Sequence, residues 1–132
     1  TDPPSQVKPQ PGQALVYFIA QNFGGIITPT TRLGLDGDWV GATHGSSWFY
    51  FQVAPGVHHL CAETVTPAES DYAQLHFTAQ SGEVYYFDAK RLSWFREGLS
   101  WSDMTLLPVD GDEGQLLVRT NPYNTSQRRQ RH

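Results

Sequence analysis

Short glycine-containing turns that lead directly into apolar or aromatic runs recur along this chain, and they constrain its fold more than any other feature. The clearest examples are residues 12–18, 36–41, 54–60 and 81–87. Each pairs a glycine turn signal with β-branched or aromatic side chains, which is the sequence pattern of a strand and its turn. We therefore expect a domain built from strands.

The same pattern predicts seven strands before residue 91. They cover residues 14–21, 32–35, 39–43, 48–53, 57–64, 72–79 and 83–90. A new strand roughly every 8–12 residues is typical of a β-sandwich. Residues 105–109 predict a last strand, and residues 112–120 predict a short helix capped by Asp112 or, less favoured, an extra strand. The predicted fold is an antiparallel β-sandwich, Ig-like or similar, of about seven to eight strands.

Large apolar side chains in the middle of the predicted strands should form the core. Trp48 is the largest of them, and we expect it to be buried. The residues predicted to pack with it are Leu15, Tyr17, Phe51, Val57 and Leu75. The glycines at positions 37, 56 and 82 are predicted to occupy turn conformations with positive φ.

The chain of 132 residues is predicted to hold one domain with two flanking segments. Residues 1–12 contain four prolines and predict a proline-rich tether. Residues 13–120 form the predicted β-sandwich, and residues 121–132 predict a flexible polar and basic tail. Because the chain opens on the tether, we expect a signal sequence upstream of it.

The charge distribution argues against nucleic acid as a partner. The formal net charge is −4, and Arg128, Arg129 and Arg131 supply three of the nine basic residues. The rest of the chain therefore holds six basic against 13 acidic residues, and such a body repels phosphate backbones. Cys61 is the only cysteine, which excludes an internal disulfide and predicts a buried free thiol.

In their order and spacing, residues 12–18, 36–41, 55–58 and 82–87 resemble the bacterial lipoprotein family called domain of unknown function 2846. Its pattern is a G-x-A-L-V-Y-F strand, a D-G-x-x-V-G hairpin, a P-G-x-H strand and a G-x-x-Y-Y-F strand. The resemblance covers about residues 12–120. It implies a β-rich domain of the periplasm or cell envelope, or alternatively a secreted one, that reaches the membrane only through an N-terminal lipid. The lipobox cysteine that would carry this lipid is not in the sequence.

Residues 91–103 interrupt the strand pattern and supply the candidate binding surface. Leu92, Phe95 and Leu99 recur at helical spacing, so the segment predicts a short helix or an ordered loop. An aromatic anchor with a polar rim suits an interaction surface. The competing interpretation is that the segment is a lid on one end of the core. The candidate binding residues are Trp94, Phe95, Arg96 and Trp101.

Histidines provide the main alternative to a binding function. His58, His59 and His76 fall on neighbouring predicted strands, where they could serve a metal-dependent or hydrolytic enzyme. Side chains alternate along a strand, so only one of His58 and His59 can join His76. The chain has no nucleophile elbow, Ser-x-x-Lys motif or phosphate loop. The sequence therefore predicts no catalytic residue, cofactor or metal.

These observations favour a non-catalytic binding or interaction module of the cell envelope. Its expected partner is an envelope protein or a glycan, and not a nucleic acid. A carbohydrate-binding module that uses exposed tryptophans is the first alternative, because tryptophan rings stack well on sugar rings. The histidine-based enzyme is the second.

Overall fold

The computed structural model describes residues 7–24, 28–66 and 70–124 of the chain. In this part the chain forms eight strands and one helix. They are β1 (Ala14–Phe23), β2 (Thr30–Leu35), β3 (Asp38–His44), β4 (Ser47–Val53), β5 (Gly56–Val65), β6 (Ser70–Ala79), β7 (Val84–Arg96), β8 (Leu99–Val109) and α1 (Gly111–Thr120). All seven strands predicted before residue 91 are present, and the favoured helix near the C-terminus is present as α1.

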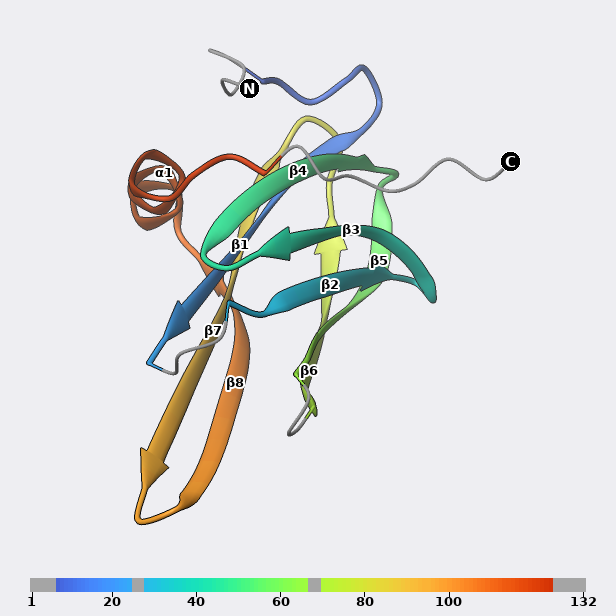
Figure 1. Cartoon of the computed structure of the whole chain (residues 1–132). Helices are drawn as coiled ribbons and strands as arrows, with labels where there is room; N and C mark the ends of the chain where they lie inside the picture. Colours follow the sequence, from blue (N-terminus) through green and yellow to red (C-terminus); the bar gives the residue numbers. More distant parts are fainter. Residues whose placement is uncertain (1–6, 25–27, 67–69, 125–132) are drawn as a thin grey trace, which may run out of the picture.

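The strands form two four-stranded sheets that pack as a β-sandwich, which confirms the predicted fold class (Figure 1). The first sheet has the order β4-β1-β7-β8, and the second has the order β3-β2-β5-β6. Neighbouring strands are antiparallel except β1 and β7, which run parallel. β1 is an inner strand of the first sheet and is apolar on both faces, because one face lies against the second sheet and the other lies under a further apolar layer.

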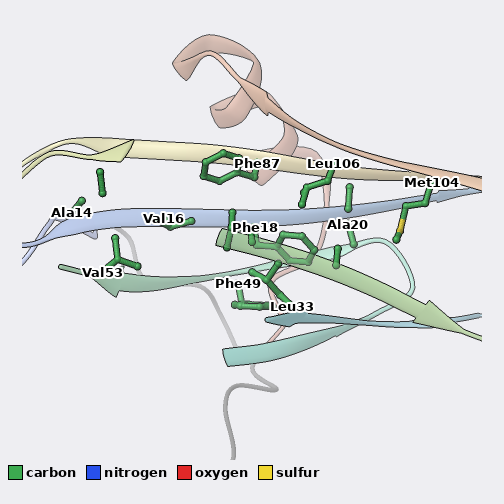
Figure 2. Packing of buried hydrophobic residues seen from close by; sticks show 14 residues of the cluster. Ala14, Val16, Phe18, Ala20, Leu33, Phe49, Val53, Phe87, Met104 and Leu106 are labelled. Carbon is green, nitrogen blue, oxygen red and sulfur yellow. The ribbon is translucent and has the colours of Figure 1, made fainter. Parts of the chain in front are cut away.

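The main core lies between the two sheets (Figure 2). It is formed by apolar side chains from both sheets, among them Val16, Phe18, Leu33, Phe49, Leu60, Phe87 and Leu106. At Gly41 of β3 the sheets approach so closely that a Cβ atom would lie 2.7 Å from the ring of Phe49. A side chain at this position would displace the Phe49 ring from the core.

The outer face of the first sheet carries a second apolar layer. Trp48 is only 3% exposed, and its ring centroid lies 5.7 Å from that of Tyr17. Tyr17 in turn stacks on Tyr86 at 4.8 Å. Helix α1 covers part of this layer, because a Cβ atom at Gly114 would lie 2.2 Å from the Tyr86 ring. Only glycine lets the helix rest this closely on the sheet.

The predicted burial is confirmed for all of the predicted core residues but one, whereas the predicted packing around Trp48 is only partly right. The residues that are buried or partly buried are Trp48, Leu15, Tyr17, Phe51 and Leu75. Tyr17 contacts Trp48, but Phe51 and Leu75 pack against the core between the sheets. Val57 is 69% exposed. Since Leu60 of the same strand points into the core, alternation places Val57 on the outer face of the second sheet. Trp48 is buried beneath the chain that follows α1 rather than between the sheets.

The cap of α1 differs from the one predicted. Asp110, rather than Asp112, caps the helix, and its Oδ1 accepts a hydrogen bond of 2.8 Å from the backbone N–H of Glu113. Asp112 lies in the first turn, where a negative charge interacts favourably with the helix dipole. The cap is therefore formed two residues earlier than the sequence indicated.

Both ends of the described chain lie along β4. The side chain of Gln52 accepts a hydrogen bond from the backbone N–H of Gln10 and donates one to the carbonyl of Lys8. Residues 122–124 lie beside Trp48. The first residues of the predicted tail are therefore in contact with β4. Residues 1–6 of the predicted tether and 125–132 of the tail lie outside the described residues.

Strands β7 and β8 form one long hairpin, which corrects the helix or loop predicted for residues 91–103. Their pairing continues without a break to Arg96 and Leu99. The turn consists of Glu97 and Gly98, with φ values of 53° and 79°. Positive φ at both positions defines the type I′ turn that suits a two-residue hairpin. Glu97 is unusual there, and this concealed the turn in the sequence.

The predicted turn glycines have the expected backbone conformation. Gly37, Gly56 and Gly82 have φ values of 93°, 130° and 85°. Together with Asp36, at φ 52°, Gly37 forms a turn of the same type between β2 and β3. These three turns are local features, and the sequence predicts them correctly.

Candidate functional site

The distal half of the β7–β8 hairpin carries all four candidate binding residues, and it extends beyond the ends of the other strands (Figure 1). Trp94 and Trp101 are directly opposite each other in the hairpin, so they share one face. Their ring centroids are 6.0 Å apart, and the ring planes differ by 23°. The two residues are 41% and 42% exposed, which leaves ring surface available for a contact.

Further apolar side chains continue this face. Leu92 lies beside Phe23 of β1, and alternation along β8 adds Leu99 and, beyond Asp103 and Thr105 on the same face, Leu107. The four apolar residues are between 44% and 67% exposed. We call the whole set the hairpin surface, which comprises Phe23, Leu92, Trp94, Leu99, Trp101 and Leu107. It lies on the same face of the first sheet as Tyr86, against which α1 packs.

The other two candidate residues divide between the faces. Arg96 pairs with Leu99 and lies on the same face as Trp94, at the tip of the hairpin. Phe95 alternates to the opposite face, where it is 75% exposed. The four candidates therefore do not form one continuous surface. The exposure of Trp94, Phe95 and Trp101 also means that residues 91–103 do not form a lid over the core.

A buried ion pair attaches the middle of the hairpin to the second sheet. Arg91 of β7 donates from Nε to Oδ2 of Asp71 of β6 at 3.0 Å, and the hydroxyl of Ser102 of β8 donates to the same oxygen. The side chains of the ion pair are only 8% and 14% exposed. Sequence reasoning missed this pair, because its members lie on different sheets and have no motif in common.

The predicted histidine cluster is only partly assembled. The register of β5 and β6 places His59 opposite His76, with ring centroids 4.6 Å apart. His59 also contacts the side-chain oxygen of Gln74 at 2.6 Å. His58 points to the other face of β5, as alternation requires. In residues 7–24, 28–66 and 70–124, no group of three or more His, Cys, Asp or Glu residues is placed to hold a metal ion.

His58 joins two turns through both of its ring nitrogens. Its Nδ1 lies 2.6 Å from Oδ2 of Asp36, and its Nε2 lies 2.6 Å from the carbonyl oxygen of Ala54. The other carboxylate oxygen of Asp36 accepts the backbone N–H of His59 at 2.8 Å. A carbonyl and a carboxylate can only accept, so this geometry favours a doubly protonated His58 ring.

The pKa values of Asp36 and His58 move in opposite directions. The hydrogen bond from the His59 backbone, followed by that from His58, lowers the pKa of the Asp36 carboxyl. Burial lowers the pKa of His58, but the hydrogen bonds to Ala54 and Asp36 together raise it by more, so the net shift is upward. The pair therefore stabilises the fold when Asp36 is ionised and His58 is protonated.

We expect the contribution of this pair to depend on pH at both ends. It is fully present between about pH 4 and pH 6.5, the ordinary pKa values of Asp and His. It is lost at higher pH as His58 passes through its raised pKa, and at lower pH as Asp36 passes through its lowered pKa. Melting temperatures of the wild type and His58→Gln across this range measure the effect. The difference between them should shrink above about pH 7. A difference that is constant with pH would contradict the ion pair.

Two further ionisable groups lie outside the predicted sites. Asp88 is 2% exposed, lies opposite Leu107, and accepts hydrogen bonds from the side chain of Gln21. Burial raises the pKa of its carboxyl. Cys61 is partly rather than fully buried, and burial also raises the pKa of its thiol. A raised thiol pKa makes Cys61 a poor nucleophile.

Comparisons with family models, with curated proteins and with solved structures find no match to this chain. The resemblance to the lipoprotein family therefore stays a prediction that rests on the four sequence stretches. The helix in the described part of the chain is too short to span a membrane.

Proposed function

We propose that this protein is a non-catalytic binding module and that the hairpin surface is where it contacts its partner. The observation that carries the proposal is the pair of half-exposed, nearly parallel tryptophan rings, Trp94 and Trp101, on a hairpin that extends beyond the sandwich. Tryptophan is among the residues that contribute most to binding energy at interfaces. Exposed apolar side chains that are contiguous on a surface commonly mark interaction sites.

The composition of the hairpin surface favours a protein partner over a glycan. Besides the two tryptophans it contains Phe23 and three leucines, whose aliphatic side chains pack against apolar protein surface. Arg96 at the tip supplies a charged rim. A glycan remains the second candidate, because its sugar rings would stack on Trp94 and Trp101 and its hydroxyls could bond to Asp103 and Lys90 on the same face.

The proposed location is the bacterial periplasm or cell envelope, with tethering through an N-terminal lipid. This part of the proposal is supported by the resemblance of residues 12–18, 36–41, 55–58 and 82–87 to the lipoprotein family. The acidic body of the chain supports a partner other than nucleic acid. A partner from the envelope is therefore the one to test first.

A photo-crosslinking experiment tests the hairpin surface directly. A benzoylphenylalanine placed at position 94 or 101 in the full chain is irradiated in the presence of a bacterial envelope fraction. The matched control carries the same group at Tyr72 of β6, which is 67% exposed on the other sheet. We expect a discrete crosslinked product from the hairpin positions. Peptides of a second protein in a tryptic digest of this product identify a protein partner, whereas a loss of mass on treatment with glycan hydrolases identifies a glycan.

Competition decides whether the crosslink reflects specific binding. Excess unlabelled wild type should abolish the product. Excess of the double variant Trp94→Thr, Trp101→Thr should compete at least roughly tenfold less well, which corresponds to about 1.4 kcal/mol of binding energy. Threonine keeps the strand propensity of the hairpin while it removes the rings. Equal crosslinking from position 72, or equal competition by the double variant, would overturn the proposal.

A further inference from the structure

The chain that follows α1 pairs with the free edge of β4. The backbone N–H of Trp48 donates to the carbonyl of Pro122 at 3.1 Å, and the backbone N–H of Asn124 donates to the carbonyl of Trp48 at 2.8 Å. Trp48 and Tyr123 form a parallel bridge. Residues 121–124 therefore extend the sheet edge in the way that a bound peptide does when it is added as a strand.

Side-chain contacts at this edge select an aromatic residue. The ring of Tyr123 lies 4.7 Å from that of Trp48 and 6.1 Å from that of Tyr50. The indole Nε1 of Trp48 donates a hydrogen bond of 3.0 Å to the carbonyl of Asn121. Trp48 thus contributes its backbone, its ring face and its indole N–H to the same four-residue segment.

The remaining contacts use groups that an extended peptide readily supplies. Pro122 provides only its carbonyl, so its missing N–H costs no hydrogen bond at the edge. The side-chain amide of Asn124 donates to the hydroxyl of Ser47 at 3.2 Å. Backbone hydrogen bonds supply affinity in such a complex, and the pocket for one side chain supplies specificity. Asn121 is also the C-cap of α1 and donates to the carbonyl of Leu117, whereas the contacts of residues 122–124 are made beyond the helix.

We propose that the edge of β4 at Trp48 is a peptide-binding site that residues 121–124 occupy intramolecularly. Its ligand is an extended segment of a partner protein that runs parallel to β4. The segment places an aromatic ring against Trp48 and Tyr50, with a proline tolerated immediately before this ring and an amide side chain immediately after it. The site lies on β4, apart from the β7–β8 hairpin, so it stands or falls independently of the proposed function.

A displacement experiment on the full chain tests the site. The variant Tyr123→Ala, Asn124→Pro removes both the ring and the N–H that bonds to the carbonyl of Trp48. Of these hydrogen bonds to Trp48, only the two to the carbonyls of Asn121 and Pro122 then remain, so an added peptide can displace the segment. The probe is a fluorescein-labelled peptide with the sequence Arg-Thr-Asn-Pro-Tyr-Asn, followed by fluorescence anisotropy. The control peptide has alanine in place of tyrosine. Wild type and Tyr72→Ala serve as control proteins, because in both the edge remains occupied.

The double variant should bind the tyrosine peptide roughly tenfold more tightly than the two control proteins do. It should bind the alanine peptide roughly tenfold more weakly than the tyrosine peptide. The single variant Tyr123→Ala should lie between the double variant and wild type. No binding by the folded double variant, or equal binding of both peptides, would overturn the proposal. Loss of the folded sandwich in both Tyr123 variants would do so too, because residues 121–124 would then be a fixed part of the fold.

Discussion

Replacing Asp71 by leucine is expected to lower the free energy of unfolding by about 3–5 kcal/mol, the cost of leaving a buried charge without its partner. Arg91 would keep its charge in a place where its side chain is only 8% exposed. Ser102 would also lose the acceptor of its hydroxyl hydrogen bond. Urea unfolding measures the change, provided that the dependence of the unfolding free energy on urea concentration is the same in both proteins.

The double variant Asp71→Leu, Arg91→Met is the matched control. It removes both charges and fills the site with apolar side chains of similar length, so we expect it to recover most of the lost stability. A loss below about 1 kcal/mol in Asp71→Leu alone would mean that the pair behaves as an exposed salt bridge. Because the pair attaches β7 and β8 to β6, hydrogen exchange of the hairpin amides should also rise in the single variant.

Truncation of Trp48 to alanine is expected to cost about 3–5 kcal/mol as well, which is typical of a large buried aromatic residue. Its ring contacts Tyr17 and Tyr123, and its indole N–H bonds to the carbonyl of Asn121. The truncation leaves a cavity under the segment that follows α1 and leaves that carbonyl without its donor. Thermal and urea unfolding measure the loss.

Trp48→Phe separates the contribution of the ring from that of the hydrogen bond. It keeps most of the apolar volume and loses the indole N–H, so its cost should be clearly smaller than that of Trp48→Ala. A melting temperature unchanged in Trp48→Ala would place the residue at the surface. Trp101→Ala is the comparison for an exposed tryptophan, since that residue is 42% exposed and its loss should change stability little.

The sequence predicts the wrong local structure for the segment that carries the candidate site. Trp94 and Trp101 stood out because they interrupt a regular pattern of strands. The spacing of Leu92 and Leu99 predicts a short helix or an ordered loop, whereas the two residues lie on one face of a hairpin. The signal for this hairpin is Gly98 between two runs that contain large apolar residues, residues 92–95 and 99–101. Glu97, which is unusual in such a turn, obscures it.

Local physics explains what the sequence alone determined about this protein. Alternating apolar residues and turn glycines at positions 37, 56 and 82 define strands within a few residues of each turn. The same local rules favoured the C-terminal helix, whose cap bonds only three residues away. These interactions join near neighbours, so the all-β class and most strand positions were predictable.

Only the tertiary structure decided which strands became neighbours. The parallel pairing of β1 with β7 brings Phe23 beside Leu92, and the packing of β6 on the hairpin brings Asp71 to Arg91. The order of strands also leaves β4 at an edge, where Tyr123 meets Trp48. Each contact joins residues far apart in the chain and depends on how two sheets are assembled. A single sequence carries no local signal for such pairings, because many strand orders bury the same apolar faces.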